Sequence, residues 1–356
     1  MNFIDQEFLL DLIKSLGGHD SINCFGRILD VAEIIPKDSN LYLELIAKWK
    51  IHKHFLDLER FDYLKKLREN RQRFSELSNY FNKSEVIPFL GAGMSIPSGL
   101  LGWEQLLYDL SLEVIGPRNI QSVRKLIASG EYEDAADEIY RHLKKNTFNE
   151  RLENRYRILS YSEIVGDIKL VTSMFPNNVI TTNFDNIIET IIKYENPDVE
   201  FKILNGIELK EFDVNHILRT TNIIKLHGDF KIPASRILLK SEYDRAYGDA
   251  SFIGKIKDIA YERTILFLGC SLNKDRYLEN IKTLKRRQTY NRRNYTILRS
   301  RYRRGDRDFH SQIDREERKL NAMNVYPIWV EEYSDIQVIL RDLLSFHAEE
   351  VELNDF

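Results

Sequence analysis

Residues 178–330 alternate short apolar runs with helical stretches, and this alternation constrains the fold more than any other feature of the chain. The runs are rich in β-branched and aromatic residues, and they are NVITT (178–182), NIIKLH (222–227), RILLK (236–240), TILFLG (264–269), YTILR (295–299) and VYPIWV (325–330). Stretches with helical spacing lie between several of them, including FDNIIETIIKY, FIGKIKDIAYE, DRYLENIKTLKR and SDIQVILRDLLSF. Continuous apolar strands joined by helices are typical of a parallel sheet covered on both faces. We therefore predict an α/β fold with a doubly wound, Rossmann-like parallel sheet.

A further apolar run, VIPFL (86–90), leads directly into Gly91-Ala92-Gly93 and then Ser95. Glycine permits a positive φ angle and lets a phosphate or sugar approach main-chain N–H groups. The dinucleotide fingerprint has a third glycine three positions after the second, where this chain has Ile96. The stretch therefore indicates a nucleotide-binding turn but not an ordinary dehydrogenase, and a tight turn without a ligand is the alternative.

Polar or small residues stand at the ends of three other expected strands. They are Thr182, Asn183 and Asp185 near the first, His227 after the second, and Gly269, Ser271 and Asp275 near a third. Ligands on open parallel sheets bind beyond the carboxyl ends of the strands, so these side chains are expected to meet at one site. The alternatives are that Asp185 caps the next helix and that His227 is a buried structural histidine.

Taken in order, the motifs GAGMS, TTNFD, KLHGD and FLGCSL resemble those of the sirtuin family, in particular its bacterial antiphage defence branch of Thoeris-type and related NAD-consuming domains. The resemblance covers residues 84–348. It implies that NAD phosphates lie on the turn formed by Gly91, Ala92, Gly93 and Ser95, and that Gly269 and Ser271 contact the adenosine side, with Thr182 and Asp275 also assigned to nucleotide binding. It further implies that Asn183 holds the nicotinamide ribose or a water, Asp185 the carboxamide, and that His227 is the general base.

Two elements of deacylating sirtuins are missing. Those enzymes carry four cysteines that bind zinc between the His-Gly strand and the Gly-x-Ser strand, whereas residues 229–268 contain no cysteine and the chain has only Cys24 and Cys270. Their Pro-Asp-Phe-Arg segment is replaced here by GLLGWE (99–104). We therefore expect no zinc and disfavour deacylation, with water as the default acceptor and with a His227 pKa near neutrality.

The expected organisation has three parts. Residues 1–84 contain FLLDLIKSL, GRILDVAEII, NLYLELIAKWKIHKHFLDL and FDYLKKLRENRQRFSELSNYF, all with helical spacing, and form an N-terminal helical module for assembly or regulation. Residues 85–350 form the NAD-binding catalytic domain. Residues 103–175 form a helical insertion within that domain.

The net charge and the hydropathy of the chain bear on whether it binds nucleic acid or a membrane. The 356-residue chain has 52 Lys and Arg against 55 Asp and Glu, so its net charge of −3 favours neither nucleic acid nor an anionic membrane. No apolar run reaches membrane length and the N-terminus lacks a secretory signal, so we expect a cytoplasmic protein without membrane association. A tract from Lys282 to Arg304 holds ten basic residues and no acidic residue. We favour a solvated face or an acidic partner surface over nucleic acid for this tract.

The sequence thus predicts an NAD+ glycohydrolase that releases nicotinamide and ADP-ribose as the effector of an antiphage system. NAD+ is then a substrate and no cofactor is expected. The alternatives are an NAD-dependent ADP-ribosyl transferase or deacylase, and a non-catalytic module that binds NAD or ADP-ribose and gates a partner. We also expect a homo-oligomer, with an ATPase or sensor protein as a possible partner.

Overall fold

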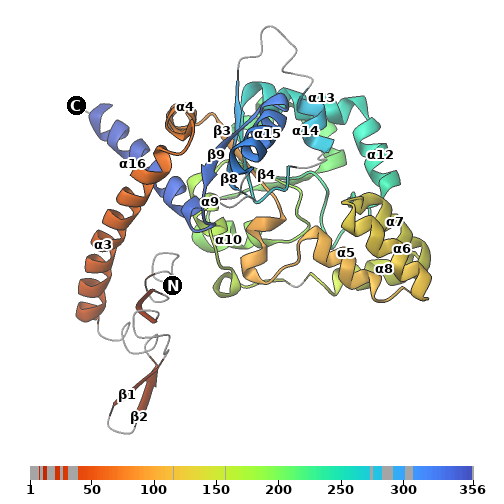
Figure 1. Cartoon of the computed structure of the whole chain (residues 1–356), viewed down its shortest axis with the longest axis horizontal. Helices are drawn as coiled ribbons and strands as arrows, with labels where there is room; N and C mark the ends of the chain where they lie inside the picture. The colour runs from red at the N-terminus through yellow and green to blue at the C-terminus, as the bar shows by residue number, and fades with distance from the viewer. Residues whose placement is uncertain are drawn as a thin grey trace. The chain divides into compact units, whose positions relative to one another are not determined.

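The computed structural model describes residues 8, 11–13, 21–24, 27–30, 39–114, 116–156, 158–272, 276–282, 292–300 and 308–354. The chain divides into two compact units, Met1–Lys66 and Leu67–Phe356 (Figure 1). The sequence predicts a boundary near residue 84, whereas helix α4 (Asn70–Asn82) lies in the second unit and not in the first. In the part of the chain that the structure describes, no helix is both long and apolar enough to cross a membrane.

The first unit contains one long helix, α3 (Ser39–Lys65), and a small antiparallel sheet. The sheet pairs β1 (Ser21–Cys24) with β2 (Arg27–Asp30), and Ile22 lies opposite Leu29. The sequence predicts a helix across residues 26–35, and this is wrong for residues 27–30. Both strands contain β-branched isoleucines, which favour the extended backbone once a neighbouring strand is present.

The second unit is built on a seven-stranded sheet in the order β5-β6-β4-β3-β7-β8-β9, with every neighbouring pair parallel. The strands are β3 (Val86–Leu90), β4 (Asn178–Thr181), β5 (Lys202–Asn205), β6 (Asn222–Lys225), β7 (Thr264–Leu268), β8 (Asn294–Arg299) and β9 (Val325–Val330). Strand β3 lies between β4 and β7, so the chain runs outward from β3 in both directions and ligand-binding residues are expected beyond the ends of these strands. This confirms the predicted Rossmann-like sheet.

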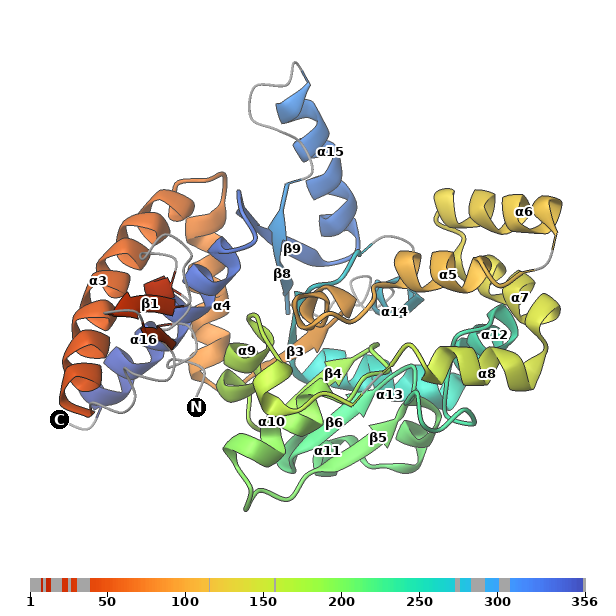
Figure 2. The same ribbon diagram turned by 90° about the horizontal axis from the view of Figure 1, so that it is seen from below.

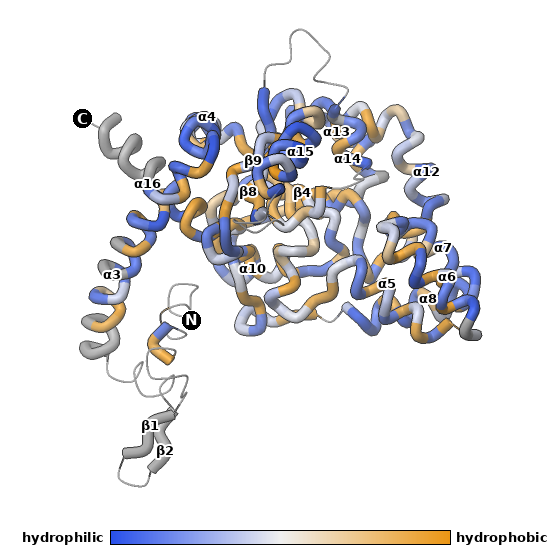
Figure 3. Tube along the Cα trace, in the orientation of Figure 1, coloured by the Kyte–Doolittle hydropathy of each residue, from blue (hydrophilic) through white to orange (hydrophobic). Residues whose placement is uncertain are grey.

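Helices flank the strands (Figure 2). They are α9 (Ile168–Met174), α10 (Ile187–Glu195), α11 (Val214–Arg219), α12 (Lys240–Gly248), α13 (Ala250–Glu262), α14 (Arg276–Ile281), α15 (Phe309–Ala322) and α16 (Asp335–Asn354). The central strands are mainly apolar (Figure 3), and all five residues of β3 and of β7 are buried. Burial on both faces explains why these strands read as continuous apolar runs.

Four helices of the predicted insertion form a cluster with its own apolar core. They are α5 (Trp103–Ser111), α6 (Pro117–Ala128), α7 (Tyr132–Leu143) and α8 (Lys145–Glu153). Phe184 and Phe230, which follow strands β4 and β6, are part of the same core and join the cluster to the sheet. Helix α9 packs against α10 and α16, so the cluster ends before it.

Two strand predictions differ from the structure. The run at 236–240 is not a strand, although Ile237 and Leu238 are buried. The Ile237 N–H donates to the His227 carbonyl, and the N–H groups of Leu238 and Leu239 donate to the Glu242 carboxylate at the start of α12. These donors are therefore used outside the sheet. Strand β5 escapes prediction because it is an edge strand whose first two residues are exposed.

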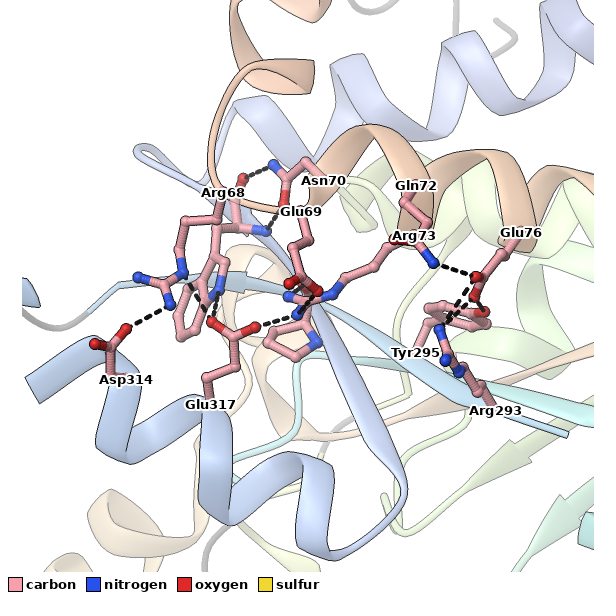
Figure 4. Close-up of polar contacts among 12 residues, drawn as sticks. Arg68, Glu69, Asn70, Gln72, Arg73, Glu76, Arg293, Tyr295, Asp314 and Glu317 are labelled. Atoms are coloured by element: carbon pink, nitrogen blue, oxygen red, sulfur yellow. Dashed lines mark hydrogen bonds and ion pairs between the residues drawn. The ribbon is translucent and has the colours of Figure 1, made fainter. Parts of the chain in front are cut away.

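A buried polar network attaches α4 to β9, the strand at one edge of the sheet (Figure 4). The Arg73 guanidinium, 2% exposed, donates to the Pro327 carbonyl of β9 and pairs with Glu317 of α15. Asn70 exchanges two hydrogen bonds with the main chain of Trp329, at 2.7 and 2.8 Å. Arg68 adds an ion pair to Glu317 at 2.7 Å. Helix α4 is thus bound to β9 and α15 by polar groups that are mostly shielded from water.

The described arginines of the basic tract are paired within the second unit. Arg292 lies 2.8 Å from Glu85, Arg293 lies 2.9 Å from Glu76, and Arg299 lies 3.6 Å from Glu332. These acidic partners offset part of the positive charge that the sequence shows in isolation.

Candidate functional site

A cavity of about 1220 Å³ opens where the carboxyl ends of the strands meet the insertion helices. Residues from five strand ends line it, together with α5 and the segment before α7. The sequence-predicted residues on its wall are Gly91, Ala92, Gly93, Thr182, His227, Gly269 and Ser271. Small-molecule sites usually have about 300–1,000 Å³, so this one is large enough for a dinucleotide.

The remaining predicted residues lie elsewhere. Ser95, Asn183 and Asp185 are buried and are not on the cavity wall. Asn183 donates hydrogen bonds to the Gly91 carbonyl of the glycine turn and to the Ser95 hydroxyl. Asp275 lies outside the described residues. The structure therefore brings residues from all four predicted motifs to one cavity, and buries Ser95, Asn183 and Asp185 of the first two motifs next to it.

The glycines of the first turn face another segment of the same chain. A Cβ atom at Gly91 would lie 2.6 Å from the Gly269 carbonyl oxygen, and one at Gly93 would lie 2.9 Å from the Gly269 Cα. The N–H groups of Gly91 and Gly93 donate to the carbonyls of Leu268 and Gly269, at 2.9 and 3.0 Å. Gly269 itself has a φ of +66°, a left-handed conformation that favours glycine. The close crossing of two loops is thus sufficient to require glycine at these positions.

A chain of hydrogen bonds fixes the side chain of Asn183. Its Nδ2 donates to the Gly91 carbonyl and to the Ser95 hydroxyl, both at 3.0 Å. Ser95 in turn donates to Asp185 Oδ2 at 2.8 Å. Because the Gly91 carbonyl only accepts hydrogen bonds, the amide of Asn183 has one possible orientation, with its NH2 group toward the turn. Its carbonyl oxygen is then the side-chain group that faces away from this anchor.

Asp185 has both oxygens engaged inside the protein. Its Oδ1 accepts from the Ile187 N–H at the start of α10, so the capping role weighed from the sequence is realised together with the Ser95 contact. Burial raises the pKa of Asp185, and the hydrogen bonds from Ser95 and Ile187 oppose that shift. This arrangement suits a residue that orients its neighbours.

A buried lysine lies below the same motifs. Lys225 is fully buried at the end of β6 and pairs with Glu189 at 3.0 Å and Asp229 at 2.6 Å. It also donates to the main-chain carbonyls of Phe184 and Asp185. Burial opposes its charge, but the two carboxylates outweigh burial and raise the Lys225 pKa. Asp229 of the His-Gly-Asp motif therefore serves this internal ion pair.

His227 is held between two tyrosine hydroxyls. Its Nε2 lies 3.0 Å from the Tyr247 hydroxyl, and its Nδ1 lies 3.3 Å from the Tyr243 hydroxyl. Burial, with a smaller contribution from Arg276, lowers the pKa of His227 from 6.5 to about 3. The expectation of a pKa near neutrality is thus wrong, because the ring is almost fully buried between the two tyrosines. His227 is neutral at physiological pH.

The side chains that surround His227 are not among the site residues predicted from the sequence. Tyr243 and Tyr247 lie one turn apart on α12, and the Arg276 guanidinium lies 5.2 Å from the centre of the Tyr243 ring. Arg276 is itself held by Glu133 of α7 and by Asp244. Two tyrosines four residues apart are expected on one face of a helix, but this spacing does not show that their hydroxyls contact His227.

Metal binding has no built site among the described residues, where no group of three or more His, Cys, Asp or Glu side chains is arranged to hold an ion.

The chain is similar to known sirtuin-like proteins. The family model described as "SIR2-like domain" matches residues 177–328. The NAD(+) hydrolase ThsA of Bacillus cereus (strain MSX-D12) is 23% identical over 266 residues, which cover 71% of this chain and 52% of the relative. ThsA of Acinetobacter baumannii (strain 532279) is 28% identical over 191 residues, or 52% of this chain and 36% of that protein.

Defense-associated sirtuin 2 of Bacillus subtilis is 26% identical over 207 residues, which are 55% of this chain and 19% of the relative. The chain thus spans about half or less of the length of these curated relatives. The matched segment contains strands β4 to β8 and the predicted motifs TTNFD, KLHGD and FLGCSL. Residues 177–328 therefore match the SIR2-like domain family, and the chain is similar to the ThsA NAD(+) hydrolases and to defense-associated sirtuin 2.

Proposed function

We propose that this chain is an NAD+ glycohydrolase of an antiphage defence system, which cleaves NAD+ into nicotinamide and ADP-ribose. The observation that carries the proposal is the cavity whose wall is shared by the glycine turn, Thr182, His227 and the segment from Gly269 to Ser271. The names of the relatives support the same activity, because the ThsA proteins are NAD(+) hydrolases.

The reaction breaks the bond between nicotinamide and the ribose carbon and forms a bond from that carbon to a water oxygen. Nicotinamide leaves with the electron pair of the broken bond, and the water loses one proton. The ribose carbon passes through an oxocarbenium-like state, so the site has to hold the leaving group and position the acceptor. We assign the acceptor role to water, since the chain lacks the deacylase elements.

Asn183 and His227 have distinct roles in this proposal. We assign the attacking water or the ribose hydroxyl to the anchored amide of Asn183, which is buried next to the glycine turn and is not itself on the cavity wall in this structure. His227 accepts the proton: the ring is neutral and has a lone pair, but its lowered pKa makes it a weaker base than a solvent-exposed histidine. Asp185, which the resemblance assigns to the carboxamide, acts here through Ser95 to keep Asn183 in place. The glycine turn and Ser271 border the space for the phosphates and the adenosine, together with Gly269.

The test is incubation of the purified chain with NAD+, followed by chromatography of nicotinamide and ADP-ribose. We expect both products in equal amounts, and we expect His227→Ala to lose at least about a hundredfold in rate, the lower end of what a positioned base contributes. Wild-type turnover by His227→Ala would refute this mechanism. Binding of NAD+ without cleavage would favour the binding module, in which His227 is only a hydrogen-bonding group. An acylated peptide in a parallel reaction tests deacylation.

We also propose that Met1–Lys66 serves in assembly or control of this activity, as a homo-oligomer or with an ATPase or sensor partner. Support comes from its separation as a compact unit that carries none of the predicted site residues.

A further inference from the structure

His227 and its two tyrosines form an asymmetric arrangement. Tyr243 lines the cavity together with His227, whereas Tyr247 is not on the cavity wall. The Tyr247 ring instead packs edge-on against Phe252 of α13, with ring centres 5.5 Å apart. The bond from His227 to Tyr247 is also the shorter one, at 3.0 Å against 3.3 Å for Tyr243. Tyr247, which is partly exposed, therefore supports the imidazole from outside the cavity, and Tyr243, which is buried, lies on the cavity side.

The asymmetry decides which nitrogen can meet a substrate. A neutral imidazole has one N–H and one nitrogen lone pair, and the partner of one nitrogen fixes the state of the other. If Tyr247 accepts the Nε2–H, the lone pair lies on Nδ1, on the side of Tyr243 and the cavity. To act as a base, His227 needs a nitrogen lone pair on the cavity side. A nitrogen that already carries a proton there could not accept one from the attacking water.

We propose that Tyr247 is a positioning residue that accepts the Nε2–H of His227 and so directs the Nδ1 lone pair to the cavity. The Tyr243 hydroxyl then occupies the place that the attacking water takes when NAD+ is bound. This rests on the proposed function. The weaker Tyr243 contact is the replaceable one, because a long hydrogen bond loses less when it is exchanged for another.

Burial, with a smaller contribution from Arg276, lowers the pKa of His227 and keeps the ring neutral, so that one ring nitrogen retains a lone pair. The Arg276 guanidinium lies over the Tyr243 ring, and its positive charge disfavours a second positive charge on the imidazole. Arg276 cannot swing away freely, since Glu133 and Asp244 both hold it. The insertion helix α7 thereby contributes, through Glu133, to the environment of His227.

The tautomer of His227 can be measured without any turnover. The full chain is labelled with 15N-histidine, and long-range 1H–15N correlation spectra distinguish a protonated ring nitrogen from one with a lone pair. The His227 signals are identified by their loss in His227→Gln. We expect wild type and Tyr243→Phe to carry the proton on Nε2, and Tyr247→Phe to show a mixture of tautomers or the proton on Nδ1. A wild-type proton on Nδ1, or an unchanged tautomer in Tyr247→Phe, would overturn the proposal.

Kinetics provide the second readout. Tyr247→Phe should lower kcat about tenfold or more with KM within about twofold, since a misdirected base harms the proton transfer and leaves binding intact. Tyr261→Phe, a matched control on α13 outside the cavity lining, should stay within about threefold of wild type. Tyr243→Phe should lower kcat less than Tyr247→Phe does, because water replaces the Tyr243 hydroxyl in the complex. Equal losses in the Tyr243 and Tyr247 variants would refute the asymmetry. If wild type cleaves no NAD+, the proposed function fails while the tautomer result stands by itself.

Discussion

Replacement of Gly93 by alanine tests why the first turn has no side chains. The new Cβ would lie 2.9 Å from both the Cα and the carbonyl oxygen of Gly269, and these backbone atoms cannot move aside as a flexible side chain would. Overpacking of this kind costs about 1–3 kcal/mol. Separation of the loops also weakens the hydrogen bond from Gly93 N–H to the Gly269 carbonyl, worth about 0.5–1.5 kcal/mol. We expect Gly93→Ala to lower the free energy of unfolding by about 2–4 kcal/mol in total.

The assay is urea denaturation followed by circular dichroism, in the absence of any nucleotide. Gly254→Ala is the matched control, because Gly254 lies within α13 and a Cβ there would meet nothing within 4 Å. That variant should be stabilised by about 0.5–1 kcal/mol, the usual gain for Gly to Ala in a helix. If Gly93→Ala unfolds at the wild-type urea concentration, the loop crossing does not explain the glycine, and a bound ligand becomes the remaining reason for it.

Three further predictions concern the buried charges and the assembly. Lys225→Met leaves Glu189 and Asp229 buried without their cation, so unfolding in urea should become easier by about 3–5 kcal/mol; a loss below about 1 kcal/mol would show that water reaches this pair. The folded-state pKa of His227 is about 3, below its usual 6.5, so unfolding takes up a proton between these values. The contribution of neutral His227 to the free energy of unfolding is therefore complete above pH 6.5 and declines as the pH falls toward 3. Melting temperatures over this range should fall more steeply for wild type than for His227→Gln. Parallel curves for the two proteins would contradict the low pKa of His227. Light scattering at micromolar concentration should report an oligomer, and a monomer would remove the assembly role proposed for residues 1–66.

The sequence was sufficient for the strands that lie in the middle of the sheet. Runs such as 86–90 and 264–268 are almost entirely apolar because helices cover both faces, and a series of such runs separated by helical stretches is typical of a parallel sheet. It was insufficient at the margins. Lys202 and Ile203 are exposed on the edge strand β5, and the buried run at 236–240 uses its donors for loop and helix contacts.

The candidate site was predictable as a set of strand ends but not as a set of contacts. Parallel strands bring their carboxyl ends to one edge, so Asn183 and His227 could be placed in the same region from the motifs alone. The low pKa of His227 depends on how completely the fold covers it, and Tyr247 reaches it from a helix twenty residues later. Neither of these depends on local sequence, so no pattern of spacing reveals them.

The crossing of the two glycine loops also restricts how this protein can change over generations. A side chain at Gly91 or Gly93 requires the segment at Gly269 to retreat, and Gly269 has Met94 N at 2.6 Å from where its own Cβ would stand. No one of the three positions can therefore acquire a side chain while the other two stay as they are. Mutations at these sites are expected to be strongly epistatic, and a lineage that alters one loop has to rebuild the wall of the cavity that both loops share.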